Sequence, residues 1–82
     1  MSVEMKIRDY VLENYLFTDD PSALANDTSF LEEGIIDSTG ILEVIAFLEE
    51  ELEIDVLDEE MIPENLDSIN NLVAFVARKK AA

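Results

Sequence analysis

The sequence predicts an all-α fold: a small antiparallel bundle of three main helices plus one short helix, with a long loop between helices one and two. Three observations lead to this class. Apolar residues recur at spacings of three and four along nearly the whole chain, as on one face of a helix. No segment alternates apolar and polar residues as a half-buried strand would. The chain has 82 residues, so positions 1–82 are expected to form one domain.

Helix one is expected from about Val3 to Phe17. Ser2 is a good candidate for its N-cap, because a serine hydroxyl can accept a hydrogen bond from a free amide of the first turn. The polar stretch at 18–21, which includes a proline, ends the helix. One face of this segment carries four large side chains at helical spacing: Val3, Ile7, Tyr10 and Val11.

A long connection is expected over residues 18–36. Loops of this length are uncommon in compact domains and are often functional. Gly34 is expected to supply a tight turn just before the next helix. We expect several apolar residues of the loop to hold it against the helices, from the set Leu24, Phe30, Leu31, Ile35 and Ile36.

Helix two is expected from Ser38 to Leu52 or Glu53, with Asp37 as its N-cap. At roughly 100° per residue, one stripe of this helix faces the core and the opposite side is largely acidic. The core stripe consists of Ile41, Ile45, Leu48 and Leu52, with Val44 on its flank. The side chains that point away are Glu43, Ala46, Phe47 and Glu50, with Leu42 and Glu49 on the border.

Two further helical segments complete the prediction. A short helical turn is expected at about 58–62, ending before Pro63, because the residue that precedes a proline disfavours helical geometry. The last helix is expected over about 69–80, capped by Asp67 or Ser68 and ending in basic residues that suit a helix C-terminus. Its buried stripe is predicted to be Ile69, Leu72, Val73 and Val76.

Composition excludes several kinds of chemistry. The chain contains no cysteine and no histidine. It therefore lacks a thiolate nucleophile, the Ser-His-Asp arrangement, the usual general base and the commonest metal ligand. Acidic clusters at 19–20, 49–51 and 58–60 lack the spacing of an EF-hand loop, so no metal site is expected. We expect a protein that is not an enzyme.

Charge points to protein partners. Twenty acidic residues against five basic ones give a net charge of -15, which repels nucleic acid and anionic membranes and attracts basic protein surfaces. Hydrophobic residues make up 49% of the chain at clear periodicity, which argues against disorder. The start does not resemble a signal peptide, and no apolar run is long enough to cross a bilayer. We expect a monomer in the cytoplasm.

The most informative segment is residues 30–40, Phe-Leu-Glu-Glu-Gly-Ile-Ile-Asp-Ser-Thr-Gly. It places Ser38 in the first turn of a helix, directly after an acidic cap and at the end of a long loop. A serine in that position is exposed at the positive end of the helix dipole. A phosphate ester there would be stabilised by the dipole and by free backbone amides.

This segment resembles the attachment site of the acyl and peptidyl carrier protein family. The matching element is Phe-x-x-x-Gly-x-Ile-Asp-Ser, followed by an acidic amphipathic helix. The spacing of helix one and the short third helix also fit, so the resemblance covers essentially the whole chain. It implies that a separate phosphopantetheinyl transferase esterifies Ser38 with 4'-phosphopantetheine from coenzyme A. The thiol of that arm would hold an acyl or aminoacyl group as a thioester.

The family resemblance also implies further partners and narrows the pathway. A ligase or transferase would load the cargo, and a synthase or transferase would use it in fatty acid or secondary metabolite biosynthesis. Fatty-acid carriers usually have leucine after the modified serine and often aspartate next, whereas this chain has Thr39 and Gly40. Residues 34–40 look closer to D-alanyl carrier proteins and to free-standing carriers of secondary pathways.

A second Asp-Ser pair, Asp67-Ser68, shows that the dipeptide alone is weak support for attachment. Both pairs precede helices, and capping explains both without a cofactor. The Gly34 turn, the long preceding loop and the acidic helix beyond favour Ser38 as the attachment site. Ser68 is interpreted as a plain cap.

Helix two is also expected to be the docking surface for partners. Its glutamates have a second interpretation as an ordinary solvated face, which is the default for any charge run. Phe47 could anchor a partner or fold back against a neighbouring helix, and the second interpretation is preferred. The predicted partner-binding residues are Asp37, Leu42, Glu43, Ala46, Phe47, Glu49 and Glu50.

The resemblance implies one more feature, a shelter for an acyl chain between the helices. Met61 and Ile62, near the short third helix, would form its lid. An aminoacyl cargo would not need such a shelter. The alternative function is an unmodified acidic interaction module that binds a basic partner through helix two.

Overall fold

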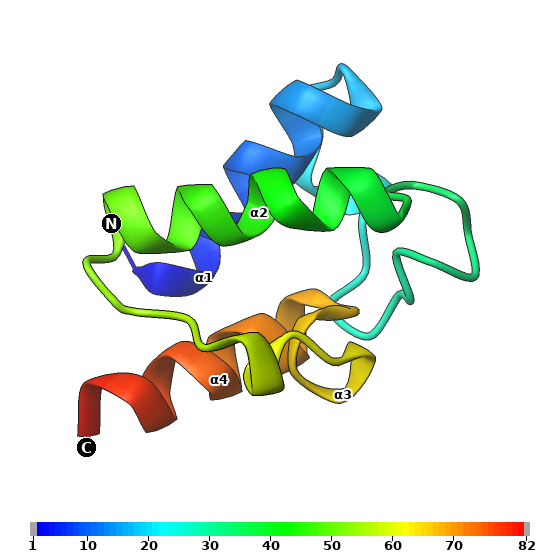
Figure 1. Ribbon diagram of the computed structural model, residues 1–82. Helices are drawn as coiled ribbons and strands as arrows, with labels where there is room; N and C mark the ends of the chain where they lie inside the picture. The colour runs from blue at the N-terminus through cyan, green and yellow to red at the C-terminus, as the bar shows by residue number, and fades with distance from the viewer. Residues whose placement is uncertain (1, 82) are drawn as a thin grey trace.

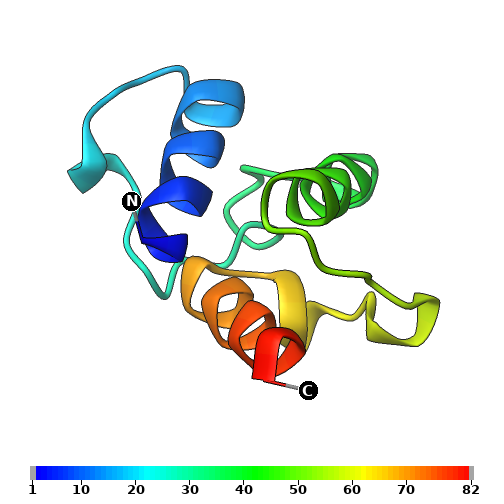
Figure 2. The same cartoon turned by 90° about the vertical axis from the view of Figure 1, so that its left-hand side faces the viewer.

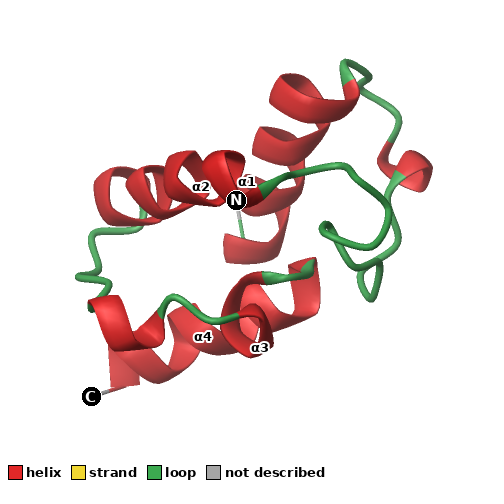
Figure 3. Cartoon of the chain, turned by 45° about the vertical axis from the view of Figure 1, so that its right-hand side comes forward, coloured by secondary structure: helices red, strands yellow, loops and turns green. Residues whose placement is uncertain are grey.

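The computed structural model describes residues 2–81. The regular structure in this range consists of helices and includes no strand, which confirms the all-α prediction (Figure 1). Figure 3 shows the loops in green, including the connections that precede and follow α2. In chain order the elements are α1 (Val3–Val11), a π-helical turn η1 (Leu12–Leu16), a 3-10 turn η2 (Pro21–Ala23), α2 (Ser38–Glu51), a 3-10 turn η3 (Asp58–Glu60), α3 (Pro63–Leu66) and α4 (Ile69–Ala81).

The three main helices surround a single core. Figure 2 shows α1, α2 and α4 placed around a common centre, with α2 and α4 running in the same direction. α1 crosses them obliquely in the opposite sense (Figure 1). The antiparallel relation predicted for the bundle is therefore that of α1 to the other two helices. α4 packs against both α1 and α3.

The core draws side chains from all three main helices and from both long connections. Leu24, Phe30 and Ile36 of the first connection are buried, as expected, whereas Leu31 is exposed. The stripe on α2 is centred on Val44, Ile45 and Leu48, and Ile41 is only half-buried. On α4, Phe75 is buried, because contact with two neighbouring helices widens the buried face. Val73, which was predicted to be buried, is only half-buried.

Side-chain caps begin the three main helices as predicted. The Ser2 hydroxyl accepts a hydrogen bond from the Met5 amide at 3.1 Å. The Asp37 carboxylate accepts one from the Gly40 amide at 2.8 Å. Ser68, not Asp67, caps α4, since its hydroxyl accepts a hydrogen bond from the Asn71 amide at 3.1 Å. Each cap satisfies an amide that has no partner within the helix, which is worth about 1 kcal/mol.

Helix one ends at Leu16, one residue before the predicted end, and its last turn is π-helical. Phe17 has a left-handed backbone, with φ 54°, and the Thr18 amide donates to the Leu12 carbonyl at 3.1 Å. The loop that follows is held against α1 by Arg8, whose guanidinium donates to the Leu24 carbonyl.

The short helical turn predicted at about 58–62 is present as a 3-10 turn, but a second short helix beyond it was missed. We expected one helical turn at 58–62 that ends before Pro63. The structure has a 3-10 turn, η3, and then a separate helix α3 that begins at Pro63. A proline fits the first position of a helix because its missing N–H would have no partner there. The same residue that interrupts one helical segment therefore starts the next.

Candidate functional site

Ser38 is the first residue of α2, and its side chain is exposed. Asp37 precedes it as the N-cap, with an extended backbone. Gly34 has φ 69°, the left-handed conformation that favours glycine, and so makes the tight turn expected before the helix. These local features deliver the Ser38 hydroxyl to solvent at the amino end of a 14-residue helix.

The loop before Ser38 is fixed at two points. Phe30 is fully buried, and its carbonyl accepts hydrogen bonds from the amides of Ile35 and Ile36 at 2.9 and 3.3 Å. Together with the Gly34 turn, these bonds close residues 30–36 into a compact unit. The serine therefore follows an ordered segment with its own anchor in the core.

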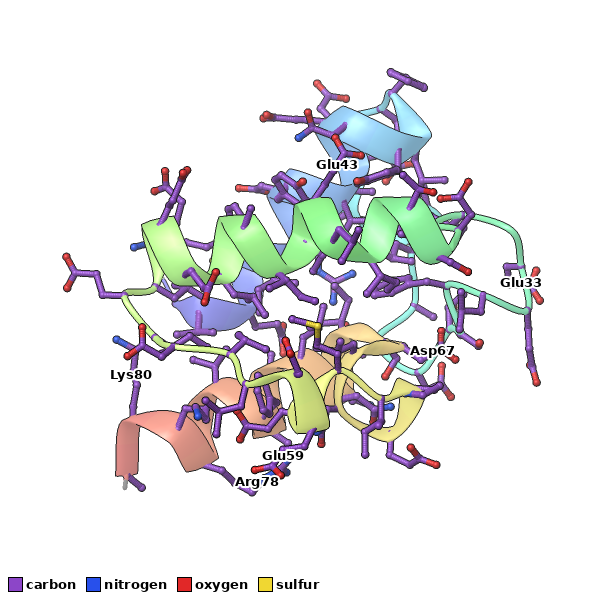
Figure 4. All side chains as sticks on the ribbon, in the orientation of Figure 1. Glu33, Glu43, Glu59, Asp67, Arg78 and Lys80 are labelled. Atoms are coloured by element: carbon purple, nitrogen blue, oxygen red, sulfur yellow. The ribbon has the colours of Figure 1, made fainter. Side chains whose placement is uncertain are left out.

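Asp67 provides the second anchor. Its carboxylate accepts hydrogen bonds from the Leu31 amide, at 2.9 Å, and from the Ser29 hydroxyl. Its carbonyl accepts one from the Phe30 amide at 2.9 Å. Figure 4 shows Asp67 where the loop meets the chain between α3 and α4. Sequence analysis missed this role, because a residue before a helix looks like a cap and its distant partners leave no local signal.

The first turn of α2 leaves two amides free to bind an anion. The amides of Gly40 and Ile41 donate to the side chain and the carbonyl of Asp37, at 2.8 and 3.0 Å. Those of Ser38 and Thr39 have no protein acceptor among the described residues. Since the positive end of the helix dipole lies here, a phosphate group on the Ser38 hydroxyl would meet a favourable field.

Ser38 also lies on the rim of a partly open apolar cleft. The cleft has a volume of about 250 Å³ and separates α2 from the segment that contains η3 and α3. All its lining residues except Ser38 and Asp67 are apolar: Leu31, Ile41, Leu42, Ile45, Met61, Ile62, Pro63 and Leu66. The side chains of Leu42, Met61 and Ile62 are partly exposed at this edge. An aliphatic group placed here would lose contact with water.

The far wall of the cleft is fastened to α4. The Lys79 ammonium and the Glu60 carboxylate form an ion pair at 2.8 Å. The Lys79 hydrogen bond, followed by that of the Leu57 amide, lowers the pKa of Glu60 below its ordinary value. Arg78 donates to the Asn65 side chain at 2.7 Å. These links hold η3 and α3 against α4, and none of the four linked residues lines the cleft.

The predicted partner residues lie on one helix but differ in their surroundings. Asp37, Leu42, Glu43, Ala46, Glu49 and Glu50 are exposed. Glu49 also accepts a hydrogen bond from the Val56 amide at 3.2 Å, so it helps to hold the chain after α2. Phe47 is half-buried and stacks on Tyr10, with ring centroids 4.2 Å apart, so the preferred interpretation of that residue is confirmed.

The two Asp-Ser pairs have opposite environments. The Ser38 side chain is exposed, whereas Ser68 is only 6% exposed and its hydroxyl takes part in the cap of α4. A second protein could reach Ser38 without disturbing the fold. It could not reach Ser68 without opening the start of α4.

Two other kinds of site are absent from residues 2–81. In that range no group of three or more acidic, histidine or cysteine side chains is arranged to hold a metal ion. None of its helices is long and apolar enough to span a membrane.

Comparison with known proteins supports the family resemblance. No protein-family model matches the chain. Over 79 residues it is 28% identical to the "Probable acyl carrier protein PigG" of a Serratia species, covering 96% of this chain and 90% of that protein. It is 26% identical to the acyl carrier protein of Bdellovibrio bacteriovorus over 82 residues, which is the full length of both. Both relatives are named as carriers.

Proposed function

We propose that this chain, a relative of acyl carrier proteins, holds an acyl group as a thioester on a 4'-phosphopantetheine arm esterified to Ser38, and presents it to partner enzymes. One observation carries the proposal: an exposed serine opens the first turn of α2 on the rim of an apolar cleft. The position suits both ends of the loaded arm. The phosphate end needs amides and a helix dipole, and the acyl end needs an apolar surface.

The residues around Ser38 fit the phosphate of the arm. The hydroxyl is exposed, and the Ser38 and Thr39 amides have no competing acceptor in residues 2–81. The Asp37 carboxylate, which would repel a phosphate, is engaged by the Gly40 amide. The bound arm would supply the terminal thiol that a chain without cysteine lacks. Since the chain also has no histidine, we assign the general base and the metal of the attachment reaction to the transferase.

The cleft favours an acyl cargo over an aminoacyl one. Its walls are aliphatic and carry a single carboxylate, that of Asp67, which is committed to the loop before Ser38. A charged amino group would lose water there without a free partner, whereas burial of each methylene is worth about 0.8 kcal/mol. Met61 and Ile62 form the outer wall, where the lid was expected.

α2 is the surface that we propose for partner enzymes. These are the phosphopantetheinyl transferase, an enzyme that loads the cargo and one that uses it. The exposed carboxylates of Glu43, Glu49 and Glu50 lie on the helix that begins with Ser38. With a net charge of -15, the chain should associate fastest with basic surfaces and more slowly as salt screens them.

The test is the intact mass of the chain after incubation with coenzyme A, Mg²⁺ and a broad-specificity phosphopantetheinyl transferase. The wild-type chain should gain one phosphopantetheine, and a Ser38→Ala variant should gain none. A Ser68→Ala variant, confirmed to be folded by circular dichroism, should still be modified. A wild-type chain that several transferases leave unchanged would point instead to an unmodified acidic interaction module.

A further inference from the structure

The π-helical turn at the end of helix one changes which side chains face α2. Tyr10 and Tyr15 are five residues apart, which in a regular α-helix would turn them roughly 140° from one another. In a π-helical turn the hydrogen bonds join residues five apart, so the two rings come to one side. They meet edge to face, with centroids 6.0 Å apart.

Tyr15 thereby reaches the start of α2. Its hydroxyl donates to Oε1 of Glu43 at 3.0 Å and lies 3.3 Å from the Gly40 carbonyl. Figure 4 shows Glu43 on the side of α2 that faces the end of helix one. Gly40 permits the approach, since a Cβ there would lie 3.3 Å from Cε1 of Tyr15 and 2.7 Å from Cγ2 of Ile36.

The Tyr15 hydroxyl acts as a donor throughout the physiological pH range. Burial raises its pKa well above the usual value of 10, and the neighbouring Tyr10 and Glu43 raise it further. The bond uses one oxygen of the Glu43 carboxylate, which is otherwise exposed. A carboxylate has about four acceptor positions, so Glu43 can still accept hydrogen bonds from a partner.

We propose that Tyr15 is a positioning residue that holds the Glu43 carboxylate ready to pair with an arginine or lysine of the enzyme that modifies Ser38. This inference rests on the function proposed above. A free glutamate must lose rotational freedom when a partner docks, and a side chain held in advance loses less. Glu50 offers the contrast, because it is exposed on the same helix and has no hydrogen bond among the described residues.

The experiment measures the steady-state kinetics of phosphopantetheine transfer from coenzyme A at low salt, with the full chain as the varied substrate. Tyr15→Phe keeps the ring and its contact with Tyr10 but removes the hydroxyl. We expect the KM for the chain to rise roughly three- to tenfold, the range that corresponds to one ordered side chain, with kcat unchanged. Circular dichroism and thermal melting confirm that the variant is folded at the assay temperature.

A double-mutant cycle separates this role from a general effect on the fold. In a Glu43→Gln background, which lacks the charge, Tyr15→Phe should change KM little further. In the matched Glu50→Gln background, it should raise KM by the same factor as in the wild type. A wild-type KM in Tyr15→Phe, or equal effects in both backgrounds, would overturn the inference while the proposed function stands. A wild-type chain that is never modified would refute both.

Discussion

Asp67 shows how many hydrogen bonds and contacts a single residue can make in a domain of this size. Its carboxylate and carbonyl hold residues 29–31, and its side chain lines the cleft beside Ser38. Local chemistry allowed the caps Ser2, Asp37 and Ser68 to be predicted, because a cap and its amide are three residues apart. Asp67 could not be assigned in this way, since its partners are more than 35 positions away.

Gly40 is a second residue whose role depends on tertiary contacts. The prediction at this position is that Gly40→Ala destabilises the protein, although alanine is the better helix former by about 1 kcal/mol. The new methyl would stand 2.7 Å from Cγ2 of the buried Ile36, and overpacking of this kind costs about 1–3 kcal/mol. We expect a net loss of about 1 kcal/mol, measured by urea unfolding. A gain in stability would show that Ile36 and Tyr15 move aside at no cost.

At the scale of elements, the bounds of the three main helices were predicted to within about two residues, whereas the start of α3 was missed. α2 and α4 begin at the predicted residues, because each follows its capping side chain directly. The π-helical turn η1 gave no signal, since the periodicity used to find helices assumes 3.6 residues per turn. Pro63 was assigned only as the end of the preceding turn, and its second role as the first residue of α3 was missed, because a proline suits both positions.

The ion pair between η3 and α4 should make stability depend on pH. Lys79 lowers the pKa of Glu60 below its ordinary value of 4.5. The stabilisation that the ion pair gives to the folded protein is therefore complete above pH 4.5. It is lost as the pH falls through the lower pKa of the folded state. Lys79→Met keeps the apolar stem and should destabilise the protein at neutral pH. The difference from wild type, measured by thermal melting, should vanish in acid.

Lys80→Met is the control for the Lys79 variant. It removes the same charge from an exposed neighbour that has no ion pair within residues 2–81. At neutral pH it should therefore destabilise the protein less than Lys79→Met does. If both variants lose the same stability at every pH, the effect belongs to net charge and the local pair contributes nothing measurable.

At the scale of the whole molecule, sequence predicted the number of main helices and most of the core but not how the helices pack. The wider buried face of α4, with Phe75 inside, follows from its two neighbours, α1 and α3. The cleft follows from the way η3 and α3 are fastened to α4 and stand apart from α2. Both depend on side chains far apart in the sequence, which periodicity within one segment does not report.

The net charge of -15 predicts that salt stabilises the protein. Raising NaCl from about 0.01 M to about 0.15 M shortens the Debye length from about 30 to about 8 Å, which weakens repulsion among the carboxylates. Each kcal/mol gained should raise Tm by roughly 4–8 °C. MgCl2 at equal ionic strength should act alike, since residues 2–81 hold no cluster of metal ligands. A Tm that does not respond to salt would contradict this expectation.

The contrast between Ser38 and Ser68 has a consequence for any enzyme that modifies this protein. In the unfolded chain the two Asp-Ser pairs are chemically alike, and folding leaves only the first hydroxyl accessible. If Ser38 is the attachment site, selectivity between the two serines comes from the substrate's own tertiary structure as well as from the enzyme. The yield of single modification would then report how much of a preparation is correctly folded.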